Sequence, residues 1–237
     1  MEFYDGNLIK EISVKSKKEY FYPVWLRTWH WLNALLFLLL IFTGVNMQYA
    51  NIKSPLIEFH SAVTLHNVSG ITLTLNYLFF IVVNFISGNY KQYIPTLQNF
   101  ISNLVLQTNF YLHGIFKNEE HPFKISNNRK FNPLQQFTYL QIMYAAVPIM
   151  VMTGWALLFP EVLIKQMFGI SGLTLTDIVH TIGAFFLSVF IIGHIYLATT
   201  GTTILINFKA MVTGWHFSPD EESEPHIYST EEASNEK

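Results

Sequence analysis

Four histidines in long uncharged stretches of the chain are candidate ligands: His30, His66, His180 and His194. An ionisable side chain is costly in a bilayer, so such residues usually face a bundle interior, a cofactor or a proton path. His180 and His194 are 14 residues apart. On an α-helix they therefore lie about 40° apart around the axis and about 21 Å apart along it. One helix face thus offers two nitrogen donors at two depths.

The other two histidines match these depths if the stretches are consecutive helices that cross a membrane. His30 lies early in the first stretch and His194 late in the fourth, so both fall in the inner half. His66 and His180 lie early in stretches that run inward, so both fall in the outer half. Two imidazoles that face each other across a bundle suit a six-coordinate haem iron. The pattern predicts two haems, held by His30 with His194 and by His66 with His180.

Other interpretations of these histidines remain open. A lone histidine in a membrane helix is commonly a hydrogen-bonded bundle residue or part of a proton path. A histidine metal site without haem would need its ligands at one depth, whereas about 21 Å separates the two levels. Gly44, Gly70 and Gly183 lie near the histidines and could give a macrocycle room, although glycine is also a common packing residue in membrane helices. The remaining histidines are expected at the interface or on the surface: His60, His113, His121, His216 and His226.

The elements that must position these side chains are four stretches without Asp, Glu, Lys or Arg. They are residues 28–52, 59–90, 131–160 and 178–208. Each can supply the roughly 20 apolar residues that a membrane-spanning helix needs. Backbone groups in lipid must bond within their own segment, and the stretches are too long for barrel strands. We expect an all-α, four-helix integral membrane bundle with spans at about 24–48, 57–86, 132–159 and 174–206.

A fifth uncharged stretch, residues 92–116, has a different character. It contains several Asn and Gln residues, and its apolar residues recur at helical spacing. This pattern is typical of an amphipathic helix that lies at the membrane interface. The sequence therefore predicts one additional interfacial helix over about 92–116.

Composition excludes several classes of protein. Hydrophobic residues make up 51% of the 237 residues and charged residues 13%, against roughly 25% charged in soluble domains. The formal net charge of −2, without a clustered basic face, argues against nucleic-acid binding. The chain has no Cys. This excludes disulfides, cysteine-ligated iron–sulfur clusters and covalently attached haem within it.

The distribution of Lys and Arg predicts the orientation in the membrane. Basic residues gather before the first span and between the second and third, whereas the other two connections have one Lys each, Lys53 and Lys165. Cytoplasmic segments carry the excess of basic residues, so both termini are expected in the cytoplasm. We divide the chain into a cytoplasmic arm (1–22), a four-helix membrane domain (23–216) and an acidic, disordered cytoplasmic tail (217–237).

With these residues placed, the chain resembles the dihaem cytochrome b membrane subunits of respiratory oxidoreductases. These are the cytochrome subunits of nickel–iron hydrogenases, the gamma subunits of formate dehydrogenases and the cytochrome b subunits of thiosulfate reductases. The resemblance covers about residues 20–216. It rests on the segments LRTWHWLNALLF, LHNVSG, KFNPLQQFTYL, HTIGAFFLSVFIIGHIYLATTG and FKAMVTGW.

The resemblance implies that His30, His66, His180 and His194 ligate two b-type haems. It also implies a quinone site near the inner haem, at the segment that includes Lys130, Phe131, Asn132 and Gln135.

Side-chain chemistry leaves two roles open at this segment and at Arg27. An amide can donate to a quinone carbonyl, and Asn132 and Gln135 are three apart, so they share one helix face. Asn132 before Pro133 is equally a helix N-cap, and both roles can hold together. Arg27, three residues before His30, could pair with a haem propionate or anchor the chain to lipid phosphate.

The family's function would make this chain an electron-transfer subunit in the bacterial inner membrane. Electrons would pass between a periplasmic-side iron–sulfur or catalytic subunit and menaquinone or ubiquinone. We find no nucleotide loop, metal-thiolate motif or nucleophile constellation, so substrate chemistry would lie in another chain. The alternatives are a stand-alone dihaem cytochrome that oxidises quinol and a haem-free membrane anchor.

Overall fold

Four long apolar helices dominate the computed structural model, which describes residues 16–49, 56–117, 119–123, 130–162, 165–167, 169–201 and 203–219. They are α1 (Val24–Tyr49), α2 (Phe59–Ile86), a third helix from Pro133 to Leu158, and α6 (Gly172–Ala198). All four are long and apolar enough to cross a membrane. The predicted all-α membrane fold is therefore confirmed. Most of the predicted arm, residues 1–15, lies outside the described residues, as do residues 220–237 of the predicted tail.

The third helix is built from three pieces. α4 (Pro133–Gln141) leads into a π-helical turn, η3 (Ile142–Ala146), and then into α5 (Val147–Leu158). Pro148 follows this turn, and because proline has no N–H it cannot complete the regular ladder. The π-turn accommodates that break. It also lets the Met143 carbonyl accept a hydrogen bond from the Tyr77 hydroxyl at 2.8 Å, which ties the third helix to α2.

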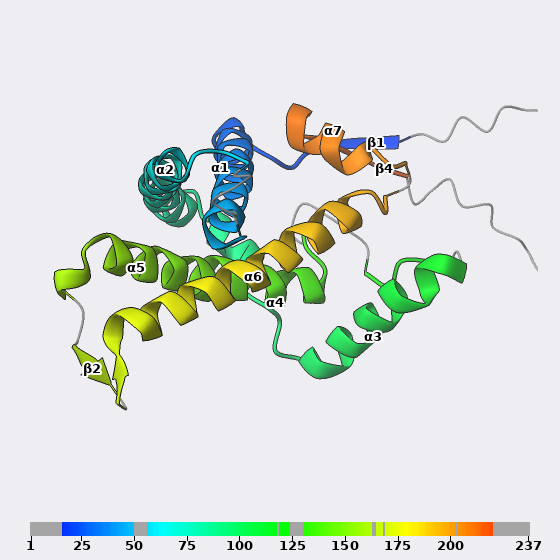
Figure 1. The fold of residues 1–237 in the computed structure, drawn as a ribbon. Helices are drawn as coiled ribbons and strands as arrows, with labels where there is room; N and C mark the ends of the chain where they lie inside the picture. Colours follow the sequence, from blue (N-terminus) through cyan, green and yellow to red (C-terminus); the bar gives the residue numbers. More distant parts are fainter. Residues whose placement is uncertain are drawn as a thin grey trace, which may run out of the picture.

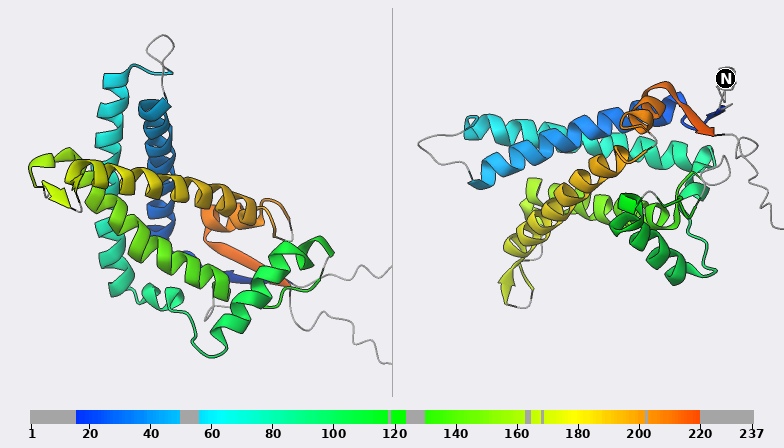
Figure 2. Two further views of the ribbon diagram at one scale, coloured as in Figure 1. Left: turned by 60° about the horizontal axis from the view of Figure 1, so that its bottom comes forward. Right: turned by 90° about the vertical axis from the view of Figure 1, so that its right-hand side faces the viewer.

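The helices form two antiparallel hairpins that cross each other. α1 packs along α2, and α5 packs along α6. Figures 1 and 2 show the second hairpin lying across the first at a wide angle. Two apolar clusters fill the layer between the hairpins. The first is centred on Trp29, Phe80 and Met143, and the second on Phe37, Leu73 and Leu187. Many large apolar side chains on the outer faces are exposed, as expected of helices that face lipid.

The predicted interfacial helix is shorter than expected. Residues 92–116 hold the end of the 3-10 turn η1 (Asn89–Tyr93), then α3 (Phe100–Leu112) and most of the turn η2 (Gly114–Lys117). The prediction of one continuous helix was wrong because Pro95 restricts Ile94 to extended backbone, with ψ at 114°. α3 exposes Ile101, Val105 and Leu112 and buries Gln107. An apolar outer face suits a helix in contact with the membrane interface.

The fourth span also differs from its predicted end. α6 ends at Ala198 instead of continuing to residue 206. Asn207 donates through Nδ2 to the Ala198 carbonyl at 3.1 Å, which satisfies one of the carbonyls left free at the helix end. The chain then turns into a separate short helix, α7 (Ile206–Thr213).

Two small β-ribbons complete the fold and were not predicted. β1 (Ser16–Tyr20) pairs antiparallel with β4 (Trp215–Pro219), and β2 (Gln166–Met167) pairs with β3 (Ile170–Ser171). Residues 217–219 are therefore part of a strand rather than of a disordered tail. The first pairing brings the two described ends of the chain to the same end of the helices (Figure 1).

Gly214 connects this ribbon to the helices. Its φ of 87° lies in the left-handed region, where it ends α7. The Gly214 carbonyl accepts hydrogen bonds from the backbone N–H groups of Phe21 at 2.9 Å and Tyr22 at 3.2 Å. A Cβ atom at this position would lie 2.6 Å from Tyr20 and 2.7 Å from the Tyr22 carbonyl oxygen. Only glycine allows the end of α7 to contact the segment that leads into α1.

Candidate functional site

The structure brings the four membrane histidines together in two pairs. The ring centroids of His30 and His194 are 6.2 Å apart, and those of His66 and His180 are 6.3 Å apart. The planes of the two rings are inclined by 54° in the first pair and by 69° in the second. α6 supplies one ring to each pair. The pairing of residues expected from matching depth is thus the pairing that the fold produces.

The spacing within each pair fits one metal ion held between two imidazoles. A metal–imidazole bond is about 2.0–2.1 Å long and a ring centroid lies about 1.1 Å from each ring atom, so two rings on opposite sides of an ion have centroids about 6.3 Å apart. Within the described residues, no group of three or more His, Asp or Glu side chains gathers as a metal site. Two donors on opposite sides leave four equatorial positions open, which is the set that a porphyrin fills.

Each ring of the pair His66/His180 is held by a threonine on the neighbouring helix. The Nδ1 atom of His66 lies 2.9 Å from Thr43 Oγ1 on α1, and Nδ1 of His180 lies 2.9 Å from Thr153 Oγ1 on α5. Both hydroxyls also donate to a backbone carbonyl four residues earlier, in each case at 2.7 Å. Because both Nδ1 atoms take part in these contacts, Nε2 is the nitrogen on each ring that is left to ligate a metal.

The pair His30/His194 has a different environment. Nδ1 of His30 is buried and has no hydrogen-bond partner among the described residues. Nδ1 of His194 lies 3.4 Å from the Tyr139 hydroxyl on α4, a long separation for a hydrogen bond. The Phe190 ring stacks on His194 with centroids 5.8 Å apart. Aromatic packing, rather than short hydrogen bonds, therefore orients this pair.

Two glycines lie beside the rings of the pair His66/His180. A Cβ atom at Gly44 would lie 3.6 Å from Cε1 of His66, and one at Gly154 would lie 3.4 Å from Cε1 of His180. The other two candidate glycines contact other residues: Gly183 lies against Met150, and Gly70 lies near Leu40. The structure therefore places Gly44 and Gly154 beside histidine rings and gives Gly70 and Gly183 packing positions between helices, whereas room for a macrocycle at Gly44 stays a prediction.

The start of α4 forms a complete capping box. Asn132 Oδ1 accepts from the Gln135 N–H at 2.9 Å, and Gln135 Oε1 accepts from the Asn132 N–H at 3.1 Å. Asn132 Nδ2 donates to the Tyr111 hydroxyl at 2.8 Å, so both polar atoms of this buried side chain are engaged. The capping role is confirmed. Contact of Asn132 and Gln135 with a quinone stays a prediction.

Lys130 links the same segment to the N-terminal end of α1. Its Nζ atom donates to the Phe21 carbonyl at 2.5 Å, and its backbone N–H donates to Gln92 Oε1 at 3.1 Å. Burial lowers the pKa of the Lys130 ammonium below its usual value. Lys130 therefore has a structural role between segments that are distant in sequence.

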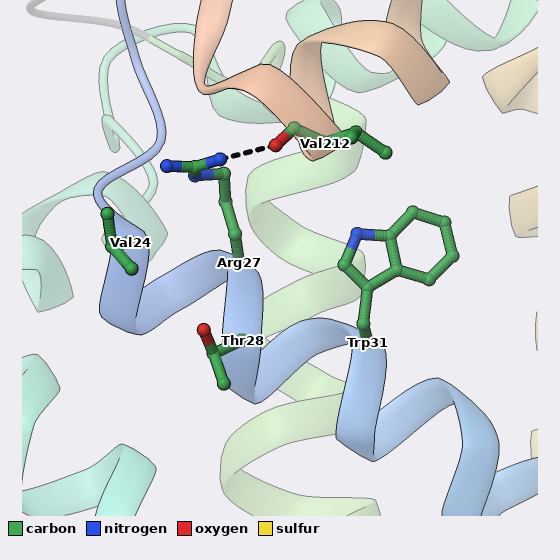
Figure 3. Close-up of a pocket in the computed structure, with 5 residues that line it drawn as sticks. All are labelled: Val24, Arg27, Thr28, Trp31 and Val212. Atoms are coloured by element: carbon green, nitrogen blue, oxygen red, sulfur yellow. Dashed lines mark hydrogen bonds between the residues drawn. The ribbon is translucent and has the colours of Figure 1, made fainter.

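Arg27 lines an open groove between α1 and α7, together with Val24, Thr28, Trp31 and Val212 (Figure 3). The groove has a volume of about 510 Å³. One guanidinium nitrogen, Nη1, donates to the Val212 carbonyl, whereas Nε is buried without a partner among the described residues. Arg27 thus fixes α7 against α1. Neither predicted partner, a haem propionate or a lipid phosphate, is tested by this arrangement.

Sequence reasoning missed Thr43, Thr153, Gly154 and Tyr139. One signal was present: a Thr-Gly dipeptide follows four apolar residues in the first span and again in the third, at residues 43–44 and 153–154. The repeat becomes meaningful only when the next helix of each hairpin is known to place a histidine beside it.

Four apolar helices that pair imidazoles across their interior define a membrane-embedded cytochrome that binds b-type haem. A family model described as prokaryotic cytochrome b561 matches residues 21–214. The chain belongs to this family of membrane b-type cytochromes, whose members act in electron transfer. A similar protein is "Putative cytochrome YdhU" of Escherichia coli (strain K12), 37% identical over 207 residues that cover 87% of this chain and 78% of that protein.

Proposed function

We propose that this chain holds two b-type haems and carries electrons across the bacterial inner membrane between a partner subunit and the quinone pool. The observation that carries the proposal is that α6 contributes a histidine to each of two pairs, His180 facing His66 and His194 facing His30. In both pairs the distance between the ring centroids is that of two imidazoles on opposite sides of one metal ion. The two levels are about 21 Å apart along the helix. A single haem would require only one of these pairs.

The roles of the chain's residues follow from this assignment. His66 and His180 hold the outer haem, and His30 and His194 hold the inner haem, each through a neutral Nε2. The haems supply reversible one-electron chemistry when bound. His30 lies at the end of the helices where Lys and Arg are in excess. This supports a cytoplasmic location for the inner pair. Both termini are then cytoplasmic.

The quinone is proposed to bind near the start of α4, close to the inner haem. Gln135 and Tyr139 are four residues apart and share one face of α4, and Tyr139 lies beside His194. Both side-chain polar atoms of Asn132 are engaged within the chain, whereas among the described residues Gln135 bonds only through its side-chain oxygen, in the capping box. Gln135 Nε2 is therefore the group that we expect to donate to a quinone carbonyl, with menaquinone and ubiquinone as the candidates.

The partner is proposed to be an iron–sulfur or catalytic oxidoreductase subunit on the periplasmic side. Without cysteine, this chain cannot hold a cysteine-ligated iron–sulfur cluster of its own. We therefore propose that electrons reach or leave the outer haem through another protein. Hydrogenase, formate dehydrogenase and sulfur-compound reductase subunits are the candidates.

Haem counting and spectroscopy of single variants test the proposal. The wild-type chain, expressed with sufficient haem, should hold two haems and show b-type bands in a reduced-minus-oxidised spectrum. His66→Ala and His194→Ala should each retain one haem. The haem that His66→Ala retains should differ in spectrum or potential from the haem that His194→Ala retains. His60→Ala is the matched control on α2, because His60 is exposed and pairs with no other histidine ring among the described residues. One haem in the wild-type protein, or loss of the same haem in both variants, would contradict the pairing.

A further inference from the structure

We propose that Thr43 and Thr153 are positioning residues that hold the outer haem at a lower reduction potential than the inner haem. The inference rests on the proposed haem ligation by His66 and His180. It concerns the second nitrogen of each ring, Nδ1, and the different hydrogen bonds that the two histidine pairs receive there.

The direction of the hydrogen bond at each threonine follows from proton counting. A hydroxyl group has a single proton to donate. Thr43 Oγ1 lies 2.7 Å from the Leu39 carbonyl, and Thr153 Oγ1 lies 2.7 Å from the Ile149 carbonyl, so each donates its proton to its own helix. The contacts of 2.9 Å to the rings then require the imidazole to donate. Both rings are therefore held in the tautomer with a proton on Nδ1 and a lone pair on Nε2.

The same device occurs in both hairpins. In each, a threonine on the first helix accepts from a histidine on the second, and the next residue is a glycine beside the ring. The distances from Oγ1 to the nearer carbonyl, to the second carbonyl and to the ring nitrogen are 2.7, 3.2 and 2.9 Å in both cases. Two independent occurrences on different helices argue for a shared task rather than for local packing.

The inner pair lacks this support. Nδ1 of His30 has no partner among the described residues, and Nδ1 of His194 reaches only the Tyr139 hydroxyl at 3.4 Å. In addition, Arg27 lies one helical turn before His30 in the sequence and carries its positive charge at this end of the helices, where it donates to the Val212 carbonyl. The two levels of the protein thus differ in ligand hydrogen bonding and in nearby charge.

Both differences act in the same direction on the irons. A ring that donates from Nδ1 becomes a stronger electron donor at Nε2, which stabilises the ferric state and lowers the reduction potential. A nearby cation favours the less positively charged ferrous state and raises it. The iron between His66 and His180 should therefore release an electron more readily than the iron between His30 and His194.

Potentiometric titration of threonine variants tests this inference. Thr43→Val and Thr153→Val keep the shape of the side chain and remove the hydroxyl acceptor, although the Leu40 carbonyl, which also interacts with the His66 ring, remains in Thr43→Val. Each should raise the midpoint potential of the haem that is absent from His66→Ala, and the double variant should raise it further. The other haem should keep its potential. Thr→Ser variants at both positions should restore the wild-type potential, because serine can form the same two hydrogen bonds.

Thr72→Val is the matched control. Thr72 lies on α2 and donates to the Val68 carbonyl at 2.8 Å, and within the described part of the chain it bonds to no histidine. Two bound haems with unshifted potentials in the Thr43 and Thr153 variants would overturn this inference and leave the proposed function intact. Fewer than two haems in the wild-type chain would overturn both. If both Val variants lose the outer haem, its retention by the Ser variants supports the positioning role, and its loss from them refutes that role.

Discussion

Gly214→Ala is expected to destabilise the end of the bundle that carries Arg27 and His30. The substitution puts a methyl group on a residue whose φ is 87°. That methyl carbon would lie 2.6 Å from a ring carbon of Tyr20, 2.7 Å from the Tyr22 carbonyl oxygen and 3.3 Å from Nε of Arg27. The Tyr20 ring and the Tyr22 backbone cannot give way as the end of a flexible side chain could, so the segment between β1 and α1 must move.

The cost can be estimated from its parts. The left-handed conformation alone costs alanine about 1 kcal/mol relative to glycine. Displacement of the segment also weakens the hydrogen bonds from Phe21 and Tyr22 to the Gly214 carbonyl, each worth about 1 kcal/mol. We therefore expect a total loss of roughly 2–3 kcal/mol.

Gly88→Ala separates backbone strain from close contact. Gly88 also has positive φ, 71°, but a Cβ atom there would meet nothing within 4 Å. This variant should lose only about 1 kcal/mol. Thermal unfolding of the purified proteins in detergent, followed by circular dichroism, measures both losses, and hydrogen exchange shows whether the β1 and β4 amides open. Equal destabilisation by the two substitutions would refute the close-contact argument.

Two further predictions concern α4 and the β1–β4 ribbon. Gln135→Leu should weaken binding of a quinone-analogue inhibitor about tenfold, through the loss of one hydrogen bond, while both haems are retained. Asn132→Asp keeps a capping oxygen and should preserve the start of α4. If Gln135→Leu binds the inhibitor as tightly as the wild-type protein does, Gln135 has only a capping role. His216 stacks on Phe21 with ring centroids 4.9 Å apart, and burial lowers its pKa from 6.5 more than the Glu19 carboxylate raises it. The unfolded ring therefore binds protons more readily, so the ribbon should lose stability as pH falls below about 6.5. Hydrogen exchange at pH 7.5 and pH 5 measures this loss, and His216→Phe should abolish the pH dependence.

The long helices and the histidine pairs could be predicted because their signals are local. A span is set by its own uncharged length, and the positions of His180 and His194 on one face follow from the period of a single helix. The depth of His30 and His66 follows from helix order. Helix length, order and period were therefore sufficient to predict which histidines face each other.

The missing features depend on contacts between segments that are distant in sequence. β1 forms because β4 returns to the same end of the helices, and neither strand is recognisable alone. The end of α6 is fixed by Asn207, which belongs to the following helix. Thr43 has the same backbone hydrogen bond as many membrane threonines, and its role beside His66 depends on the packing of α1 against α2. The break before α3 was the exception, since Pro95 is a local signal.

Because α6 contributes a ring to each pair, neither histidine pair exists before the last long helix has been synthesised and inserted. A chain truncated before Gly172 would contain His30 on α1 and His66 on α2 without His194 and His180, the rings that face them. Under the proposed ligation, a chain that ends before α6 would hold neither haem between two histidines, and bound haem would therefore report that α6 has been inserted.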